Sequence, residues 1–284
     1  AIKIEPDFEV GEEVSEEVHL VDFGRRAILS LRQNLISRIQ EHDNTDLYNK
    51  YKELVGEIIS GEVHHIRNRE VIIIDDMDNE VILPKDQQIR SDFFRKGDTI
   101  RGVVKEVQLK GMKPRIVLSR TSPKFLERLF EQEIPEVADG LIIVKRVERI
   151  PGEKAKVAVE SYDERIDPVG ACVGMKGSRI HGIVRELGNE NIDVINYTSN
   201  TSLFISRALS PAKVSSITID EDNSRAEVFL KPDQVSLAIG RGGTNIRLAG
   251  SISGYEIDVY RDVDDTEDVA LAEFVDEIDG WIID

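Results

Sequence analysis

The chain has 284 residues, enough for two or three domains, and its one cysteine, Cys172, excludes an internal disulfide framework and a cysteine-based zinc site. No apolar run reaches the length that spans a bilayer and no signal peptide is visible, so we expect a cytoplasmic protein with no membrane partner. The net charge of −17 lies at the ends, because residues 1–22 and 262–284 hold 18 of the 54 acids and one of the 37 bases. Residues 23–261, with 36 acids and 36 bases, can therefore carry a local basic stripe for RNA.

The first predicted element is an amphipathic helix over residues 22–41, which follows a polar, acidic segment. Asp22 is a suitable N-cap, and apolar residues recur at four-residue steps from Phe23 to Ile39. A helix with such a stripe must bury it against another part of the protein.

Residues 50–120 change to the short alternating or β-branched runs that are typical of strands. Five such runs, separated by turns, suit a small closed barrel of the OB type. His64 and His65 fall within one predicted strand, so one side chain is expected to face inward and the other outward. The run 75–78 lacks the glycine and the distal glutamate of a calcium loop and therefore predicts a hairpin turn.

Ser122 and Pro123 begin the next predicted helix, with serine at the cap and proline in the first turn. From there the order helix, strand, strand, helix, helix, strand occurs twice, over residues 121–198 and 199–261. The connection between these two modules is too short for a flexible linker, so we expect them to pack against each other. In the acidic tail, apolar residues from Leu271 to Ile282 have helical spacing and predict either a protein-binding segment or the start of a further domain.

Each module carries a glycine loop of the form apolar-Gly-x-x-Gly-x-x-Ile, at residues 173–180 and 239–246. Glycine lets the backbone approach a ligand closely, and the N–H groups that open the following helix point toward an anion. With Lys176 in one loop and Arg241 in the other, the natural anion is a nucleic-acid phosphate. A lone G-x-x-G is more often a helix C-cap beside a turn, but two copies with the same flanks favour a binding function. A dinucleotide site is disfavoured because the G-x-G-x-x-G spacing is absent.

The predicted RNA-binding residues lie in both glycine loops and on the barrel. In the first module they are Gly174, Met175, Lys176, Gly177, Arg179 and His181. In the second module they are Gly240, Arg241, Gly242, Gly243, Asn245 and Arg247. On the barrel they are Arg67, Arg69, Phe93, Phe94 and Arg95, with one phenylalanine expected in the core. The strand residues Ile192, Val194, Ile257 and Val259 either accept unstacked bases or belong to the core.

No catalytic constellation, cofactor motif or metal-ligand set stands out in the sequence. We therefore expect a protein that is not an enzyme and that needs neither a cofactor nor a metal ion. Cys172, at the position that Ala238 occupies in the second module, is expected to be a small buried residue.

The glycine loops resemble the signature of KH domains, which clamp single-stranded RNA, and the element order is that of the type II KH fold. The ending Leu118-Ser119-Arg120 resembles the S1-type RNA-binding barrel. The order barrel, KH, KH, after a helix opened by residues 22–26, is similar to the NusA family of bacterial transcription elongation factors. Supporting strings are residues 132–136, 150–159, 167–174 and 238–240.

The resemblance implies an α+β multidomain fold, with a five-stranded S1-type OB barrel followed by two tandem type II KH domains. Residues 1–49 are implied to be the end of an N-terminal polymerase-binding domain, and residues 50–120 the barrel. The two KH domains are implied to be residues 121–198 and 199–261, and residues 262–284 form an acidic tail. We expect the chain to hold only the last part of that N-terminal domain.

In the family, the N-terminal domain binds RNA polymerase near the RNA exit channel, and the barrel and KH domains bind nascent RNA. The implied function is to modulate pausing, termination and antitermination, with single-stranded RNA, RNA polymerase and further transcription factors as partners. Two alternatives stay open. One is the RNA-binding accessory region of an RNA-processing enzyme, although such enzymes place a single KH domain before the barrel. The other is a KH-fold protein-interaction adaptor, which the intact basic loops disfavour.

Overall fold

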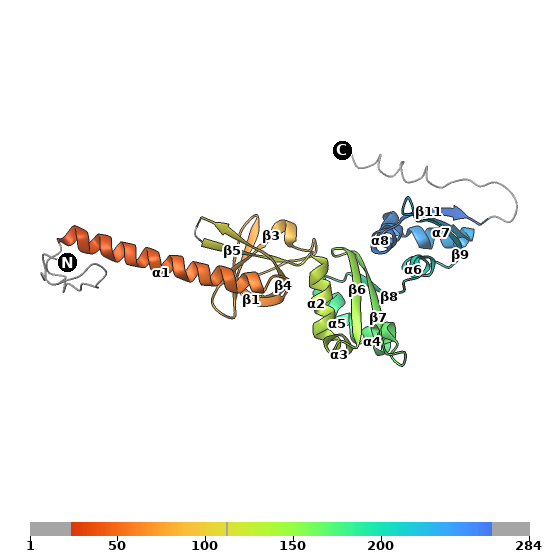
Figure 1. Ribbon diagram of the computed structural model, residues 1–284, viewed down its shortest axis with the longest axis horizontal. Coiled ribbons are helices and arrows are strands. Elements are labelled where there is room, and N and C mark those ends of the chain that lie inside the picture. Colours follow the sequence, from red (N-terminus) through yellow and green to blue (C-terminus); the bar gives the residue numbers. More distant parts are fainter. Residues whose placement is uncertain (1–23, 112, 263–284) are drawn as a thin grey trace, which may run out of the picture. The chain divides into compact units, whose positions relative to one another are not determined.

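The computed structural model describes residues 24–111 and 113–262. The first element, α1 (Arg25–Glu53), continues well past the predicted end near Glu41 (Figure 1). No glycine or proline interrupts the helix between Glu41 and Glu53, so nothing in the sequence ends it at the predicted point. The expected cap, Asp22, and the first stripe residue, Phe23, lie outside the described residues.

The expected burial of the α1 stripe is not found among the described residues. Leu31, Leu35 and Ile39 are each more than half exposed, at 55%, 59% and 51%. The part of α1 up to Lys50 belongs to a different compact unit from residues 51–108 and 115–262. In residues 24–111 and 113–262, no helix combines the length and the apolar character that a membrane span requires.

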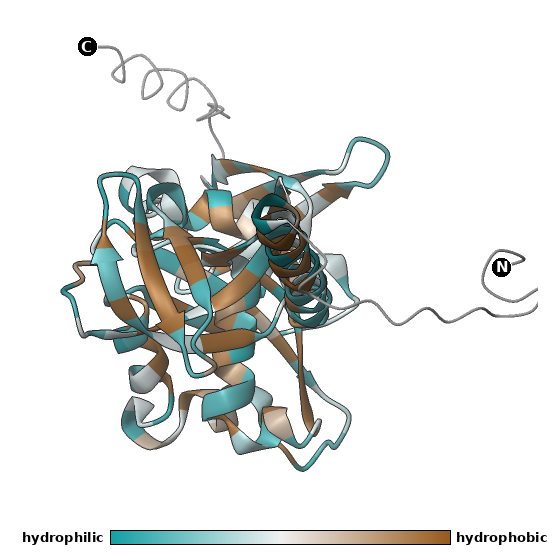
Figure 2. Ribbon diagram, turned by 90° about the vertical axis from the view of Figure 1, so that its left-hand side faces the viewer, coloured by the Kyte–Doolittle hydropathy of each residue, from teal (hydrophilic) through white to brown (hydrophobic). Residues whose placement is uncertain are grey.

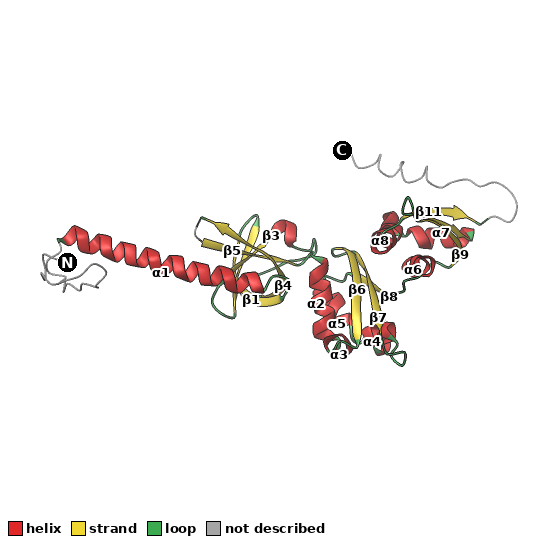
Figure 3. Ribbon diagram, viewed as in Figure 1, coloured by secondary structure: helices red, strands yellow, loops and turns green. Residues whose placement is uncertain are grey.

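Five strands close a barrel, as predicted, in the order β1-β2-β3-β5-β4 (Figures 1 and 3). They are β1 (Ile58–Ile66), β2 (Glu70–Asp75), β3 (Glu80–Pro84), β4 (Thr99–Lys110) and β5 (Lys113–Ser119). Strands β3 and β5 pair in parallel, whereas β1 pairs antiparallel with β2 and β4. The barrel interior is filled by fully buried apolar side chains, among them Val63, Ile73, Leu83, Ile116 and Leu118. A short 3-10 turn (Lys85–Gln87) follows β3.

The prediction for the two histidines of β1 is wrong. The register of β1 against β2 shifts between Val63 and His65, and both His64 and His65 are exposed. A bulge of this kind adds a residue to one strand and so breaks the alternation of faces on which the prediction depended. The predicted turn after β2 is confirmed, because the Asp75 carboxylate accepts the backbone N–H groups of Met77 and Asn79 at 3.0 and 2.9 Å.

Two modules of the predicted type II KH topology follow the barrel. The first comprises α2 (Pro123–Glu133), α3 (Pro135–Ala138), β6 (Ile142–Ile150), β7 (Lys154–Ser161), α4 (Pro168–Val173), α5 (Ile180–Glu186) and β8 (Asn191–Asn196). The second comprises α6 (Thr201–Ala208), β9 (Val214–Asp220), β10 (Arg225–Leu230), α7 (Pro232–Ile239), α8 (Thr244–Ser253) and β11 (Glu256–Arg261). In each sheet the middle strand pairs antiparallel with the strand before it and parallel with the last, giving the orders β6-β7-β8 and β9-β10-β11.

Helix α2 begins and packs as the sequence predicts. The Ser122 hydroxyl accepts the backbone N–H of Lys124 at 3.2 Å, and Pro123 occupies the first turn. One side of the helix is fully buried in the core of the first module, with Phe125, Leu126, Leu129 and Phe130 all at 0% exposure. In Figure 2 the strands are largely hydrophobic, whereas the connecting loops are mostly hydrophilic.

The side chain of Arg120, directly after β5, joins the barrel to the first KH module. Its guanidinium donates to the Asp92 carboxylate at 2.9 and 3.2 Å, to the Glu186 carboxylate at 2.6 Å and to the Glu186 carbonyl at 2.7 Å. Burial by itself lowers the pKa of Arg120, but the hydrogen bonds and charges of Asp92 and Glu186 outweigh it and raise that pKa. The cation is therefore permanently charged and fully paired in a site that excludes water.

The two KH modules also share a hydrophobic contact. Ala158 of β7 and Ile195 of β8 are buried in the core of the second module. Around them, Arg146 donates to the carbonyls of Ile252 and Ser253 at the end of α8, at 2.8 and 3.1 Å. Because these carbonyls have no partner within their own helix, the arginine supplies bonds that would otherwise be missing. Helix α8 of the second module thus packs against the sheet of the first.

We expect Arg120→Leu to lower the free energy of unfolding by roughly 3–5 kcal/mol, because the buried carboxylate of Asp92 would lose its charge partner. The matched control is Arg165→Leu, since Arg165 pairs with Asp163 on the surface, with 88% of its side chain exposed. That change should cost about 0–1 kcal/mol. Chemical denaturation of both variants measures the difference, and equal costs would contradict a structural role for Arg120.

Candidate nucleic-acid interface

The two glycine loops adopt the same backbone conformation. The first glycine has φ/ψ of 73°/170° at Gly174 and 74°/176° at Gly240. Two residues later, Lys176 (53°, 30°) and Gly242 (59°, 29°) are both left-handed. A hydrogen bond closes each loop, from Gly177 N–H to the Gly174 carbonyl at 3.1 Å and from Gly243 N–H to the Gly240 carbonyl at 3.3 Å. The sequence repeat is therefore a structural repeat down to individual torsion angles.

The loop tips present side chains to solvent. Met175 is 89% exposed, and Lys176, Arg241 and Gly242 are also exposed. Lys176 is one of four non-glycine residues with positive φ in the described part of the chain. For a lysine this conformation costs about 1–2 kcal/mol, and it is found in a loop that presents a positive charge to solvent.

Among the predicted residues of the glycine-loop helices, His181 and Arg247 are exposed, in agreement with a role at a surface. Asn245, which is also among the predicted RNA contacts, differs from these two residues in being buried. Asn245 is 2% exposed, and its amide donates to the carbonyls of Leu209, Leu237 and Ala238 at 3.1–3.2 Å. Its Oδ1 accepts from Lys154 Nζ of the first module at 3.0 Å. A helical period alone could not reveal this, because the partners come from other elements.

Arg179 is also engaged within the protein. One of its guanidinium nitrogens donates to the Glu136 carboxylate and to the Ala171 carbonyl, both at 2.8 Å. A hydrogen bond from its own backbone amide, followed by the bond from Arg179, holds the pKa of Glu136 below its usual value. About a third of the Arg179 side chain stays exposed, at 35%.

On the barrel, the predicted aromatic residues differ in exposure. Phe93 is 78% exposed with the Arg95 guanidinium 5.6 Å from its ring centre, an arrangement that leaves a ring face for stacking. Phe94 is half-buried, with the Arg120 guanidinium 5.8 Å from its ring centre, and is not one of the buried core residues. Arg69 is exposed, and Arg67 is exposed with a 3.3 Å ion pair to Glu70.

The strand residues for which the sequence allowed either a base-binding groove or the core differ between the two modules. Ile257 and Val259 are 9% and 7% exposed and belong to the core of the second module. Ile192 and Val194 are only half-buried against the core of the first. Val194 also lines a hollow of about 560 Å³ with Val169 of α4, and residues of the second module, among them Arg207 and Lys213, line the same hollow.

A larger hollow, of about 960 Å³, lies at the second glycine loop. Arg241, Gly242 and Arg247 line it from the second module, and Lys154 and Asn191 line it from the first. Lys154 lies on a strand of the other module and reaches this loop only through tertiary packing, and its ammonium pairs there with Asp193 at 2.9 Å. Two exposed arginines, Arg241 and Arg247, thus line one concave surface.

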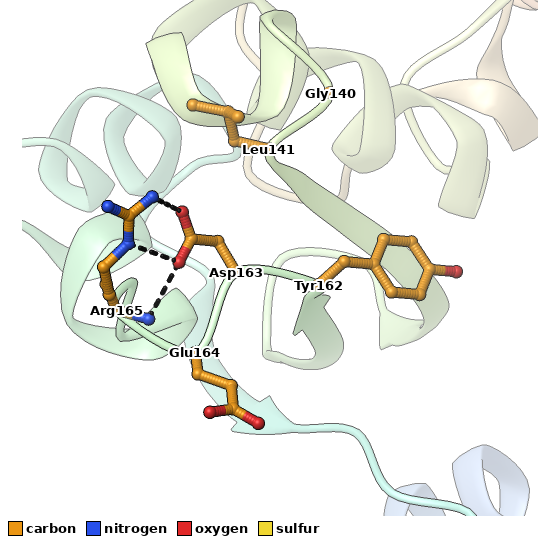
Figure 4. Close-up of a pocket in the computed structure, with 6 residues that line it drawn as sticks. All are labelled: Gly140, Leu141, Tyr162, Asp163, Glu164 and Arg165. Atoms are coloured by element: carbon orange, nitrogen blue, oxygen red, sulfur yellow. Dashed lines mark hydrogen bonds and ion pairs between the residues drawn. The ribbon is translucent and has the colours of Figure 1, made fainter.

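A third hollow, of about 600 Å³, lies between Leu141 and the turn after β7 (Figure 4). There Arg165 points at Asp163 and forms hydrogen bonds of 2.7 and 3.0 Å with its carboxylate, while Tyr162 points away. Because this arginine is already neutralised, the hollow offers an anion little, and it contains none of the predicted site residues.

Cys172 lies in α4, two residues before the first glycine of the loop, and is fully buried, as predicted. Burial, followed by the charge of Glu136, raises the pKa of its thiol to about 12, so the thiol is neither a nucleophile nor a metal ligand at neutral pH. Within residues 24–111 and 113–262, no group of three or more histidine, cysteine or acidic side chains could hold a metal ion.

Comparisons with known proteins agree with this geometry. Residues 1–45 match the NusA N-terminal domain, residues 120–197 the NusA-like first KH domain and residues 201–267 the NusA-like second KH domain. The chain is 38% identical over 257 residues to the transcription termination/antitermination protein NusA of Thermus thermophilus, covering 90% of this chain and 66% of that protein. It is 36% identical over 264 residues to the protein of the same name from Bacillus subtilis, covering 93% and 71%. Against the one from Rickettsia conorii it is 37% identical over 257 residues, covering 89% and 51%, so the chain spans about half to about 70% of these relatives.

The two glycines of one loop should differ in their tolerance of alanine. A Cβ on Gly240 would lie 2.7 Å from Asn245 Cβ in a backbone region that only glycine readily occupies, so Gly240→Ala should cost roughly 2–4 kcal/mol. A Cβ on Gly243 would meet nothing within 4 Å, so Gly243→Ala should cost only about 1 kcal/mol for its left-handed φ. Thermal or chemical unfolding measures both; the same cost at the two positions would show that the close approach is unimportant.

Proposed function

The chain belongs to the NusA family, and we propose that it binds nascent single-stranded RNA and RNA polymerase to modulate transcriptional pausing, termination and antitermination. The observation that carries RNA binding is the pair of glycine loops with matching torsion angles and exposed basic tips. Polymerase binding is proposed through the N-terminal segment, because residues 1–45 match the NusA N-terminal domain. The proposed site of action is the cytoplasm, where transcription takes place in bacteria.

The proposed domains are 1–49, 50–120, 121–198, 199–261 and 262–284. The closed barrel, the two three-stranded sheets and the matched ranges support the middle three. The proposed RNA-binding residues keep the exposed members of the predicted set, which are Met175, Lys176, His181, Arg241, Gly242, Arg247, Arg67, Arg69, Phe93 and Arg95.

We further propose that the protein acts by binding and not by catalysis. The thiol of Cys172 is held protonated at neutral pH, and the exposed arginines of the second loop, Arg241 and Arg247, can hold phosphates by charge alone. Of the two alternatives, an accessory region of an RNA-processing enzyme finds no support in the matched families. A KH-fold adaptor that has lost RNA binding is disfavoured by Lys176, which is exposed and has a strained left-handed conformation. Backbone strain of this kind is concentrated at functional sites, here a site suited to an anion.

Charge reversal at the two loop tips tests RNA binding. The double change Lys176→Asp with Arg241→Asp should keep the fold, because both side chains are exposed and aspartate tolerates a left-handed φ. Affinity for a short single-stranded RNA should fall by at least about tenfold, and the slope of log affinity against log salt should become shallower by about 1.4, for two lost phosphate contacts. Fluorescence anisotropy at several salt concentrations measures both quantities.

The control for that double change is Lys231→Asp, which makes the charge change of one of its two substitutions at the opposite end of α7, roughly 12 Å from the loop. It should leave the affinity within about twofold, since a single exposed charge at that distance is largely screened. If the loop variant and the control bind RNA equally well, the glycine loops are not the binding site.

We also propose that the two modules bind one continuous RNA. The support is the set of contacts that fixes one module on the other, together with the hollow lined by both. The variant Ala158→Asp places a charge in their apolar contact. It should remove the steep gain in affinity, roughly 10² or more, that lengthening the RNA from one loop to both should give. A length series on both proteins measures this gain, and a gain that survives the change would mean that the modules act independently.

A further inference from the structure

The residue two positions after the second glycine has a common structural role in both loops. This residue is Arg179 in the first module and Asn245 in the second. Arg179 donates to the carbonyl of Ala171 at 2.8 Å, and Asn245 donates to the carbonyl of Leu237 at 3.2 Å. Ala171 and Leu237 are both the third residue before the first glycine of their loop. The two side chains, one charged and one neutral, therefore bond to the same backbone position.

The bond spans the glycine loop. Ala171 and Leu237 lie in the last turn of α4 and α7, where carbonyl groups have no partner within the helix. The donors lie where the next helix begins, at Arg179 and Asn245. Each side chain thus links the end of one helix to the start of the next by a hydrogen bond that spans the glycine loop.

The first glycine of each loop packs against the same side chain. A Cβ on Gly174 would lie 2.9 Å from Arg179 Cγ, and a Cβ on Gly240 would lie 2.7 Å from Asn245 Cβ. These glycines are therefore needed for contact within the protein, in addition to any approach to RNA. The spacing from the first glycine to this side chain is the same in both modules for that reason.

A second bond anchors each side chain to the leading helices of its module. Arg179 pairs with Glu136 of α3 at 2.8 Å, and Asn245 donates to the Leu209 carbonyl at the end of α6 at 3.2 Å. The loop is therefore tied to a part of the module that packs against the sheet.

We propose that Arg179 and Asn245 are positioning residues that hold the two glycine loops in their RNA-receiving conformation and do not themselves bind phosphate. A loop that is already ordered loses less conformational entropy when the RNA binds, so the free energy of binding is more favourable. The positive charge of Arg179 is dispensable in this role, because an uncharged amide does the same work in the second module. The RNA part of this inference rests on the proposed function, whereas the loop geometry can be tested without RNA.

The test compares Arg179→Leu, which has no donor, with Arg179→Gln, which keeps an amide donor like that of Asn245. In the full chain without RNA, the amide resonances of Gly174 and Gly177 should shift or broaden in Arg179→Leu and return toward their original positions in Arg179→Gln. The amides of Gly240 and Gly243 are the internal control and should stay in place in both variants.

With a short single-stranded RNA, Arg179→Leu should weaken binding roughly tenfold, and Arg179→Gln should recover most of this loss. The slope of log affinity against log salt should be unchanged in both, since no phosphate contact is removed. If Arg179→Gln binds as weakly as Arg179→Leu and the slope becomes shallower by about 0.7, Arg179 contacts a phosphate and the proposal is wrong. Unchanged loop resonances and unchanged affinity in Arg179→Leu would also overturn it.

Two further outcomes separate this inference from the proposed function. If the unsubstituted chain fails to bind single-stranded RNA, the proposed function fails, while the loop resonances still decide whether Arg179 holds the loop. If Arg179→Leu does not fold, Arg179→Gln against the unsubstituted chain decides alone. An unchanged salt slope then supports the positioning role, and a shallower slope excludes it.

Discussion

Ion pairs between buried arginines and glutamates hold the barrel and the first KH module in a fixed relation, and the position of the first glycine loop depends on them. Arg120 leaves the last strand of the barrel and binds Glu186, the last residue of the helix that follows the first glycine loop. A second pair, Arg149–Glu190, is completely buried with a shortest distance of 2.6 Å, and the same arginine donates to the carbonyl of Arg120. Such pairs cost much to desolvate and are stable only with good geometry, so they favour one arrangement over its neighbours.

The basic residues of this chain divide between structure and surface, and the division matters for the proposed binding of RNA by an acidic protein. Lys156 is fully buried, and burial lowers its pKa although the charge of Asp193 at 3.0 Å partly offsets the effect. It also donates to the Ser210 carbonyl of the second module. Bases of this kind are unavailable to phosphate. The positive charge available for the proposed RNA contacts therefore comes from fewer residues than the composition suggests. These residues lie at the loop tips and at the edge of one hollow.

The two KH modules have the same loop conformation with different residues. Lys176 occupies the left-handed position by accepting strain, whereas Gly242 occupies it freely. The first loop therefore places a charge at the position where the second places only backbone, and the second carries its charge one residue earlier, at Arg241. The modules are equivalent as folds and are not interchangeable as binding surfaces.

The sequence by itself determined the local elements and their order. The five barrel strands, the cap at Ser122 and the repeated loops follow from periodicity, turn residues and glycine spacing, because each of these is decided by residues close together in the chain. It placed the end of α1 too early, since no glycine or proline interrupts the helix before Glu53, and it gave His64 and His65 opposite faces, which a bulge in β1 prevents. Only the tertiary structure decided which polar residues of the predicted site stay free. Asn245 and Arg179 have the sequence position of ligand contacts, but their hydrogen-bond partners come from α3, α6 and the neighbouring module. The physical reason is that a polar side chain is satisfied by whatever surrounds it in space, and helical spacing carries no information about those neighbours.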